Sequence, residues 1–189
     1  MGILGGFAKK AAAKAALKVA SEMYLNYDES KRGEKAQTDK CTFQNITYIY
    51  SNEVLDERKK RIYKLKKPAF SHGLILTDLD GEELGKISAS KFLGDIDIRV
   101  SADGKDYGSV VREVSVQNKF SISKTKWSIE QFKMFSDSYA VYDKYDEMIF
   151  KFHYTNTNSI VLEYDDSDFE HIGILVAKTV AIYESLISK

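Results

Sequence analysis

The side chains best suited to chemistry are few and scattered along the chain. Its three histidines, His72, His153 and His171, lack the close spacing of a zinc site. The single cysteine, Cys41, has no histidine or aspartate partner suggested by the sequence, so we interpret it as a partly buried free thiol. No GxGxxG fingerprint or Walker loop is present. The sequence therefore predicts no catalytic residue, no metal site and no cofactor.

One acidic segment resembles part of a calcium loop. Asp78, Asp80, Glu82 and Glu83 follow one another closely, but the run is far shorter than a twelve-residue EF-hand loop and lacks its terminal glutamate spacing. A solvated hairpin turn is the favoured interpretation of this segment.

The most concentrated charge feature is a basic run between residues 58 and 67. Such a run can bind anionic lipid headgroups through charge and hydrogen bonds. It is also typical of a solvated strand edge that protects against aggregation. After Arg58, its members are the candidate lipid-binding or anion-binding residues Lys59, Lys60, Arg61, Lys64, Lys66 and Lys67.

A second basic feature lies at the start of the chain. Residues 1–25 are rich in alanine and lysine, which favour a helix. Lys10, Lys14 and Lys18 would share one face of that helix, opposite a shallow apolar face, so they join the candidate lipid-binding residues. The alternatives are that this helix packs on its own domain or on a second copy of the chain. Residues 26–40 are charged and aperiodic and are predicted to form a linker.

Composition limits the possible classes of protein. The chain has 189 residues and equal numbers of acidic and basic side chains, 28 of each, so no global field favours nucleic acid or acidic membranes. One cysteine allows no internal disulfide, and no signal peptide is recognisable. We expect one domain, residues 41–189, in a cytoplasmic protein.

The C-terminal segment organises the predicted fold. Apolar residues between 168 and 188 fall on every side of a helical wheel, so this helix must be buried. Ser167 and Glu170 have the spacing of a capping box. The helix is long enough to span a bilayer, but Lys178 and Glu184 count against that alternative. We expect Lys178 to reach an acidic or carbonyl group or the mouth of the surrounding structure. Gly173 suggests close approach of a neighbouring wall.

The preceding residues predict short antiparallel strands. Alternation is clear over 45–50 and 95–101, and Asp80-Gly81 and Asp103-Gly104 have the composition of type I′ hairpin turns. A helix with its side chains is about 10–12 Å wide, so enclosing it takes roughly eleven or twelve strands. The fold class is therefore mainly β, a closed antiparallel barrel around the central C-terminal helix. Further predicted strands cover 61–67, 72–77, 84–90, 107–113, 118–123, 125–131, 138–143, 148–154 and 159–164.

From Cys41 to the end, the order of elements resembles the tubby-like barrel superfamily. The likeness rests on strand, Asp-Gly turn, strand hairpins and on the last strand leading through an acidic cap into the apolar helix, and it is greatest for the LURP-one-related and phospholipid-scramblase-like branch. The resemblance implies a twelve-stranded barrel around a hydrophobic helix. It also implies association with membranes or phosphoinositides, although no position matches a ligand residue of the family.

Two functions follow as hypotheses. The first is a non-enzymatic protein that binds anionic phospholipid or phosphoinositide at the cytoplasmic membrane surface. The second is a soluble interaction or scaffold module that lacks lipid affinity and has a protein partner or self-associates through the N-terminal helix. No nucleic acid partner is expected. An enzyme is not expected, because the helix would occupy the barrel interior.

Overall fold

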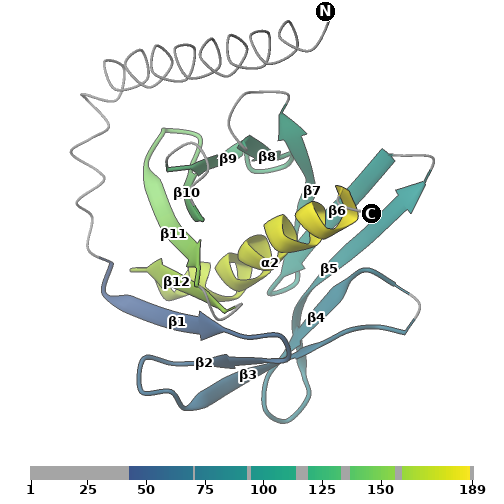
Figure 1. The fold of residues 1–189 in the computed structure, drawn as a ribbon. Coiled ribbons are helices and arrows are strands. Elements are labelled where there is room, and N and C mark those ends of the chain that lie inside the picture. The colour runs from purple at the N-terminus through teal and green to yellow at the C-terminus, as the bar shows by residue number, and fades with distance from the viewer. Residues whose placement is uncertain are drawn as a thin grey trace, which may run out of the picture. The chain divides into compact units, whose positions relative to one another are not determined.

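A single helix, α2 (Glu170–Ile187), runs through the middle of a ring of strands in the computed structural model (Figure 1). The structure describes residues 43–69, 71–92, 95–113, 119–132, 137–155 and 159–187. The predicted N-terminal helix with Lys10, Lys14 and Lys18, the predicted linker and Cys41 lie outside these residues.

Twelve antiparallel strands close the barrel. Each pairs with its neighbours in sequence, and β1 pairs with β12 to complete the ring. This confirms the predicted barrel around a C-terminal helix. The strands are β1 (Asn45–Ile49), β2 (Glu53–Leu55), β3 (Arg61–Lys66), β4 (Leu74–Thr77), β5 (Glu83–Phe92), β6 (Asp95–Ala102), β7 (Lys105–Glu113), β8 (Lys119–Ile122), β9 (Trp127–Gln131), β10 (Ser138–Tyr142), β11 (Met148–Tyr154) and β12 (Ile160–Tyr164).

The short strand β2 was not predicted from the sequence. It has three residues, of which only Val54 is buried, so it is too short to show alternation. It is held between β1 and β3 by backbone pairing, and the turn before it is closed by the Tyr50 amide, which donates to the Glu53 carbonyl at 2.9 Å.

The two Asp-Gly dipeptides form different turns. Asp103 and Gly104 are the two residues between β6 and β7, with φ of 52° and 72°, so the predicted type I′ turn is confirmed. The prediction for Asp80-Gly81 was wrong. These residues lie in a five-residue loop, 78–82, in which Gly81 has positive φ but Asp80 does not.

Three hairpins use that same five-residue loop. The first residue is Asp56, Asp78 or Asp143, and its carboxylate accepts a hydrogen bond from the amide of the fifth residue at 2.7–3.0 Å. The fourth residue, Lys59, Gly81 or Asp146, has positive φ. The aspartate therefore holds the loop by an Asx-type bond, and the third hairpin needs no glycine.

The start of the helix differs from the prediction. A 3₁₀ turn, η2 (Ser167–Phe169), precedes α2, and the Asp166 carboxylate accepts a bond from the Asp168 amide at 2.9 Å. The predicted Ser167/Glu170 capping box was therefore wrong, because Asp166 is the N-cap and Glu170 points its side chain to the barrel wall.

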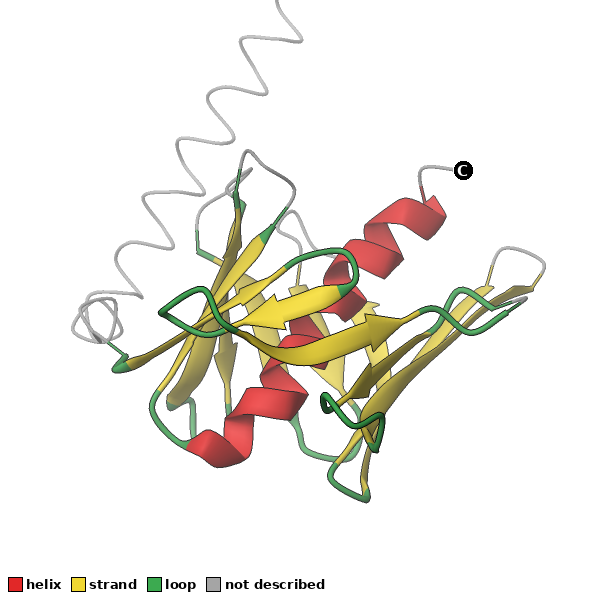
Figure 2. Cartoon of the chain, turned by 90° about the horizontal axis from the view of Figure 1, so that it is seen from below, coloured by secondary structure: helices red, strands yellow, loops and turns green. Residues whose placement is uncertain are grey.

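From Ile172 to Val180 the helix is buried on nearly every side, as predicted, whereas Glu184, Ser185 and Ile187 near its C-terminal end are exposed. Ile172, Ile174, Leu175, Val176 and Val180 have no exposed surface, although they lie around the whole circumference of α2. Figure 2 shows the helix passing lengthwise between strands on both sides of it. Among the described residues, no helix is long and apolar enough to cross a membrane.

Glycines allow the helix to approach the wall. A Cβ atom on Gly173 would lie 3.0 Å from Leu162 Cδ2 of β12, which confirms the predicted close contact. A Cβ atom on Gly85 of β5 would lie 2.7 Å from Leu175 Cδ1 of α2 and 2.6 Å from the Ser101 carbonyl oxygen. The lack of a side chain at Gly173 and at Gly85 therefore lets the helix pack closely against β12 and β5, respectively.

Candidate anion-binding pocket

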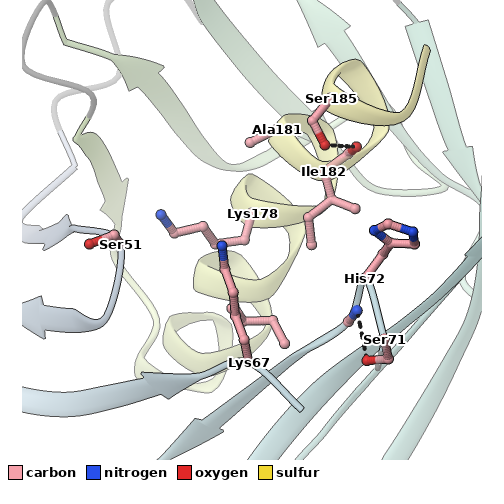
Figure 3. Close-up of a pocket in the computed structure, with 10 residues that line it drawn as sticks. Ser51, Lys67, Ser71, His72, Lys178, Ala181, Ile182 and Ser185 are labelled. Atoms are coloured by element: carbon pink, nitrogen blue, oxygen red, sulfur yellow. Dashed lines mark hydrogen bonds between the residues drawn. The ribbon is translucent and has the colours of Figure 1, made fainter. Parts of the chain in front are cut away.

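A pocket of about 360 Å³ opens beside the C-terminal half of α2, where the helix faces the β1–β2 turn and the segment between β3 and β4 (Figure 3). Its volume is at the small end of the range for ligand sites. The residues that line it are Ser51, Lys67, Ser71, His72, Gly73, Leu74, Lys178, Ala181, Ile182 and Ser185.

Helical spacing brings one side of the pocket together. Ala181 and Ile182 lie three and four residues after Lys178, and Ser185 lies four and three residues after them, so these residues share one face of α2. Ala181 and Ile182 supply apolar surface, and Lys178 supplies the charge. On the side away from the pocket, Thr179, Val180 and Leu186 are buried against the barrel.

Strand alternation places the second lysine. In β3, Tyr63 and Leu65 face the helix; Lys67 follows the strand, is exposed at the barrel mouth and lines the pocket. Its neighbour Lys66 lies on the outer face. Figure 3 shows Lys67 and Lys178 directing their ammonium groups into the same space. The expectation that Lys178 reaches the mouth of the barrel is thereby confirmed.

The electrostatics of the pocket are those of two cations without a counter-charge. No described carboxylate forms an ion pair with Lys67 or Lys178, and the other titratable side chain of the lining is His72. Burial, together with the charge of Lys67, lowers the pKa of Lys178 to about 8. A bound anion would offset both the cost of burying the Lys178 charge and its repulsion by Lys67, so the pocket is suited to phosphate or carboxylate groups.

The floor of the pocket is fixed by backbone contacts. The Gly73 amide donates to Ser71 Oγ at 3.1 Å. A Cβ atom at Gly73 would clash with the Ile87 carbonyl oxygen, so glycine is required where this segment runs beside β5. Ser51, Ser71 and Ser185 add hydroxyl groups to the lining, of which Ser185 donates to the Ile182 carbonyl at 2.8 Å.

The other predicted basic residues are not brought to this pocket. Lys59 and Lys60 lie in the β2–β3 loop at the opposite end of β3 from Lys67, about 20 Å away for a strand of this length. Lys59 lies over the Tyr48 ring. Arg61 Nε donates to Glu53 at 2.7 Å, and Lys64 Nζ donates to the Leu79 carbonyl at 2.5 Å.

A polar cluster at the start of α2 was not predicted. The Glu170 carboxylate accepts a bond from Tyr63 Oη at 2.9 Å and from Thr47 Oγ1 at 3.4 Å. Burial and the Glu170 charge raise the pKa of Tyr63. His171 Nδ1 lies 2.7 Å from an Asp103 oxygen and also contacts the Tyr63 ring edge-on. These bonds tie the first turn of the helix to the barrel.

The histidines have separate surroundings. His72 lines the pocket, His171 pairs with Asp103, and His153 Nδ1 is 4.0 Å from Glu163. Within the described residues, no three histidine, cysteine, aspartate or glutamate side chains are grouped as metal ligands. Asp78 and its neighbours form the hairpin loop described above.

Sequence reasoning found part of the pocket. It singled out Lys67 by its basic neighbours and Lys178 as a cation in an apolar helix, but it did not bring the two together. Ser51, Ser71 and His72 were not associated with a site. The alternation of β3 was the available signal that Lys67, unlike Lys66, lies on the pocket side of the chain, where it lines the pocket while remaining exposed.

Comparisons with known proteins extend only to the fold. No protein-family model matches the sequence, and no curated protein matches it. The crystal structure of a protein from Arabidopsis thaliana is similar, with a TM-score of 0.50 and 15% identity, over 77% of this chain and 91% of that one. At this identity the likeness supports the barrel fold.

Proposed function

We propose that this chain is a non-enzymatic protein of the tubby-like barrel class, on its LURP-one-related and phospholipid-scramblase-like branch, that binds the phosphate-bearing headgroup of an anionic lipid at a cytoplasmic membrane surface. One observation carries the proposal. Lys67 and Lys178 share a pocket of headgroup size and have no carboxylate partner among the described residues. The charge of the partly buried Lys178 is costly near a second cation unless an anion joins them.

The fold supports a role in ligand binding and not in catalysis. The helix fills the barrel interior with apolar side chains, so the open space described above lies at the barrel mouth. A pocket at the mouth is accessible to a headgroup that projects from a membrane. The predicted basic helix with Lys10, Lys14 and Lys18 would supply a second contact, since stable peripheral binding takes more than one signal.

Vesicle co-sedimentation tests this function. The full chain should bind vesicles that contain a phosphoinositide and not vesicles of phosphatidylcholine, and binding should weaken as salt rises. At about 1 kcal/mol for each lysine near an anionic surface, the double variant Lys67→Met/Lys178→Met should lose about thirtyfold in affinity. The free inositol phosphate should compete with the vesicles for the pocket.

Lys66→Met is the matched control, because Lys66 is adjacent in sequence and lies on the outer face of β3. It should change affinity by less than Lys67→Met. Equal losses from both variants would assign binding to general charge and not to the pocket. If the intact chain ignores anionic vesicles at low salt, the protein-interaction module without lipid affinity becomes the better account.

A further inference from the structure

Lys178 differs from other lysines of the barrel in what surrounds its amine. Lys119 and Lys151 each lie 3.1 Å from a glutamate, Lys91 donates to the Leu186 carbonyl at 2.6 Å, and Lys64 donates to a carbonyl as well. Among the residues that the structure describes, Lys178 has no such partner; it is flanked by Ala181 and Ile182 and lies near a second cation, Lys67. A lysine beside another cation in a partly apolar pocket is the arrangement that makes an amine nucleophilic.

We propose that Lys178 forms a reversible imine with a ligand that carries both a carbonyl group and a phosphate, with Lys67 holding the phosphate. The inference rests on the anion-binding role of the pocket proposed above and adds a covalent bond to it. It concerns capture of a ligand and requires no turnover.

The pKa of Lys178 supports this chemistry. With a pKa of about 8, roughly a fifth of the side chain is the neutral amine near pH 7.4, compared with about 0.1% for an ordinary lysine. The neutral amine is the nucleophile. The charged group that faces it is Lys67, just after β3; the β1–β2 turn contributes the neutral Ser51, and His72, in the segment before β4, lines the far side of the pocket beyond Ile182 (Figure 3).

The proposed step balances without an oxidant or reductant. The lone pair of neutral Lys178 Nζ forms a bond to the carbonyl carbon, and a proton passes from nitrogen to oxygen to give a carbinolamine. The C–O bond then breaks, water leaves with that oxygen, and the C=N bond forms. The pocket is open to solvent, which can supply the proton that the departing hydroxyl needs. Addition of water reverses the step.

The test uses pyridoxal 5′-phosphate as the probe, followed by borohydride reduction and mapping of the labelled lysine by mass spectrometry. In the full chain near pH 7.4, Lys178 should be labelled at least tenfold faster than any other lysine, and inorganic phosphate should slow its labelling. Lys178→Arg should remove the fast component. Lys67→Met should slow labelling by the phosphate-bearing probe at least tenfold and slow labelling by pyridoxal less.

Two controls keep the outcome decisive. Lys66→Met should leave the labelling of Lys178 unchanged, and thermal melts should show that each variant is folded. Labelling spread evenly over the lysines would overturn the imine. If phosphoinositide vesicles still bind through Lys67 and Lys178 in that case, anion binding stands and the covalent step alone fails. Fast labelling of Lys178 that neither phosphate nor Lys67→Met affects would overturn both the phosphate anchor and the proposed function.

Discussion

Lys178 carries a charge in a place where burial and a neighbouring cation both oppose it. Its pKa in the folded chain is about 8, below the ordinary value of 10.5, so the unfolded chain binds more protons between these pH values. Stability contributed by this group therefore rises as pH increases from about 8 to 10.5, and below pH 8 the folded state carries the full cost of the charge.

The variant Lys178→Met should remove that cost. It should be more stable than the natural chain near pH 7, by on the order of 2 kcal/mol, and the difference should shrink toward pH 10.5 as the natural lysine loses its proton. Urea denaturation of both proteins across this pH range measures the difference. A difference that does not change with pH would mean that the Lys178 pKa is not lowered.

Two glycines test the packing of the helix against the wall. A Cβ atom at Gly85 would meet the backbone of Ser101 and Ala102 as well as Leu175, and backbone cannot move aside cheaply. At Gly173 it would meet only the flexible side chain of Leu162, and alanine favours a helix by about 1 kcal/mol over glycine. Gly85→Ala should therefore destabilise the fold by about 1–3 kcal/mol, and Gly173→Ala should be nearly neutral. Denaturation midpoints check the order; a neutral Gly85→Ala would contradict the close contact.

At the scale of elements, α2 is the core of the domain. It contributes a continuous group of fully buried residues from Ile172 to Ala177, and the inner faces of the strands pack against it. The Lys91 ammonium also bonds to a carbonyl in its last turn, and Tyr63 and Thr47 bond to Glu170 in its first. The helix is thus attached to the barrel at both ends.

Deleting residues 170–189 should leave an insoluble or unfolded chain, because the lining of the barrel would face water. Deleting residues 188–189 alone, which removes none of these contacts, is the control and should leave a cooperative thermal transition. Circular dichroism melts compare the two. A truncated chain that lacks α2 and still melts cooperatively would disprove the role given to the helix.

The elements show where sequence reasoning succeeds. The helix and the longer strands were predictable because their apolar patterns extend over many residues. The three-residue β2 was missed because Val54 alone gives no pattern. Ser167 and Glu170 have the spacing of a capping box, but the Asp166 carboxylate caps the 3₁₀ turn before the helix. The Glu170 carboxylate instead accepts hydrogen bonds from the Tyr63 and Thr47 hydroxyls of the barrel. Competition of this kind depends on tertiary contacts, so the local sequence does not reveal it.

At the scale of the molecule, the net charge is zero, but the two ends of the barrel carry different side chains. The antiparallel order puts the three loops that begin with an aspartate, 56–60, 78–82 and 143–147, at the end where α2 begins, and the first of them also carries Arg58, Lys59 and Lys60. The pocket with Lys67 and Lys178 lies at the other end, near the second half of α2. The basic run was predictable as a stretch of sequence, but its division between two ends and two faces follows from the strand register.

This arrangement predicts which end meets a membrane. If the pocket end faces the lipid, the variant Lys59→Gln/Lys60→Gln should reduce affinity for phosphoinositide vesicles by less than threefold, whereas Lys67→Met/Lys178→Met should reduce it by about thirtyfold. Co-sedimentation at one fixed salt concentration compares them. A larger loss from the Lys59 and Lys60 variant would place the opposite end against the membrane.

The central claim, that Lys67 and Lys178 form an anion site, is tested most directly by titrating the Lys178 amine by NMR, with Lys178→Met to identify its signal. In the free protein we expect a pKa of about 8. Saturating inorganic phosphate or inositol phosphate should raise that pKa, because the bound anion stabilises the charged amine, and by linkage affinity should increase as pH falls through 8. A pKa near 10.5 that does not respond to either anion would contradict the account.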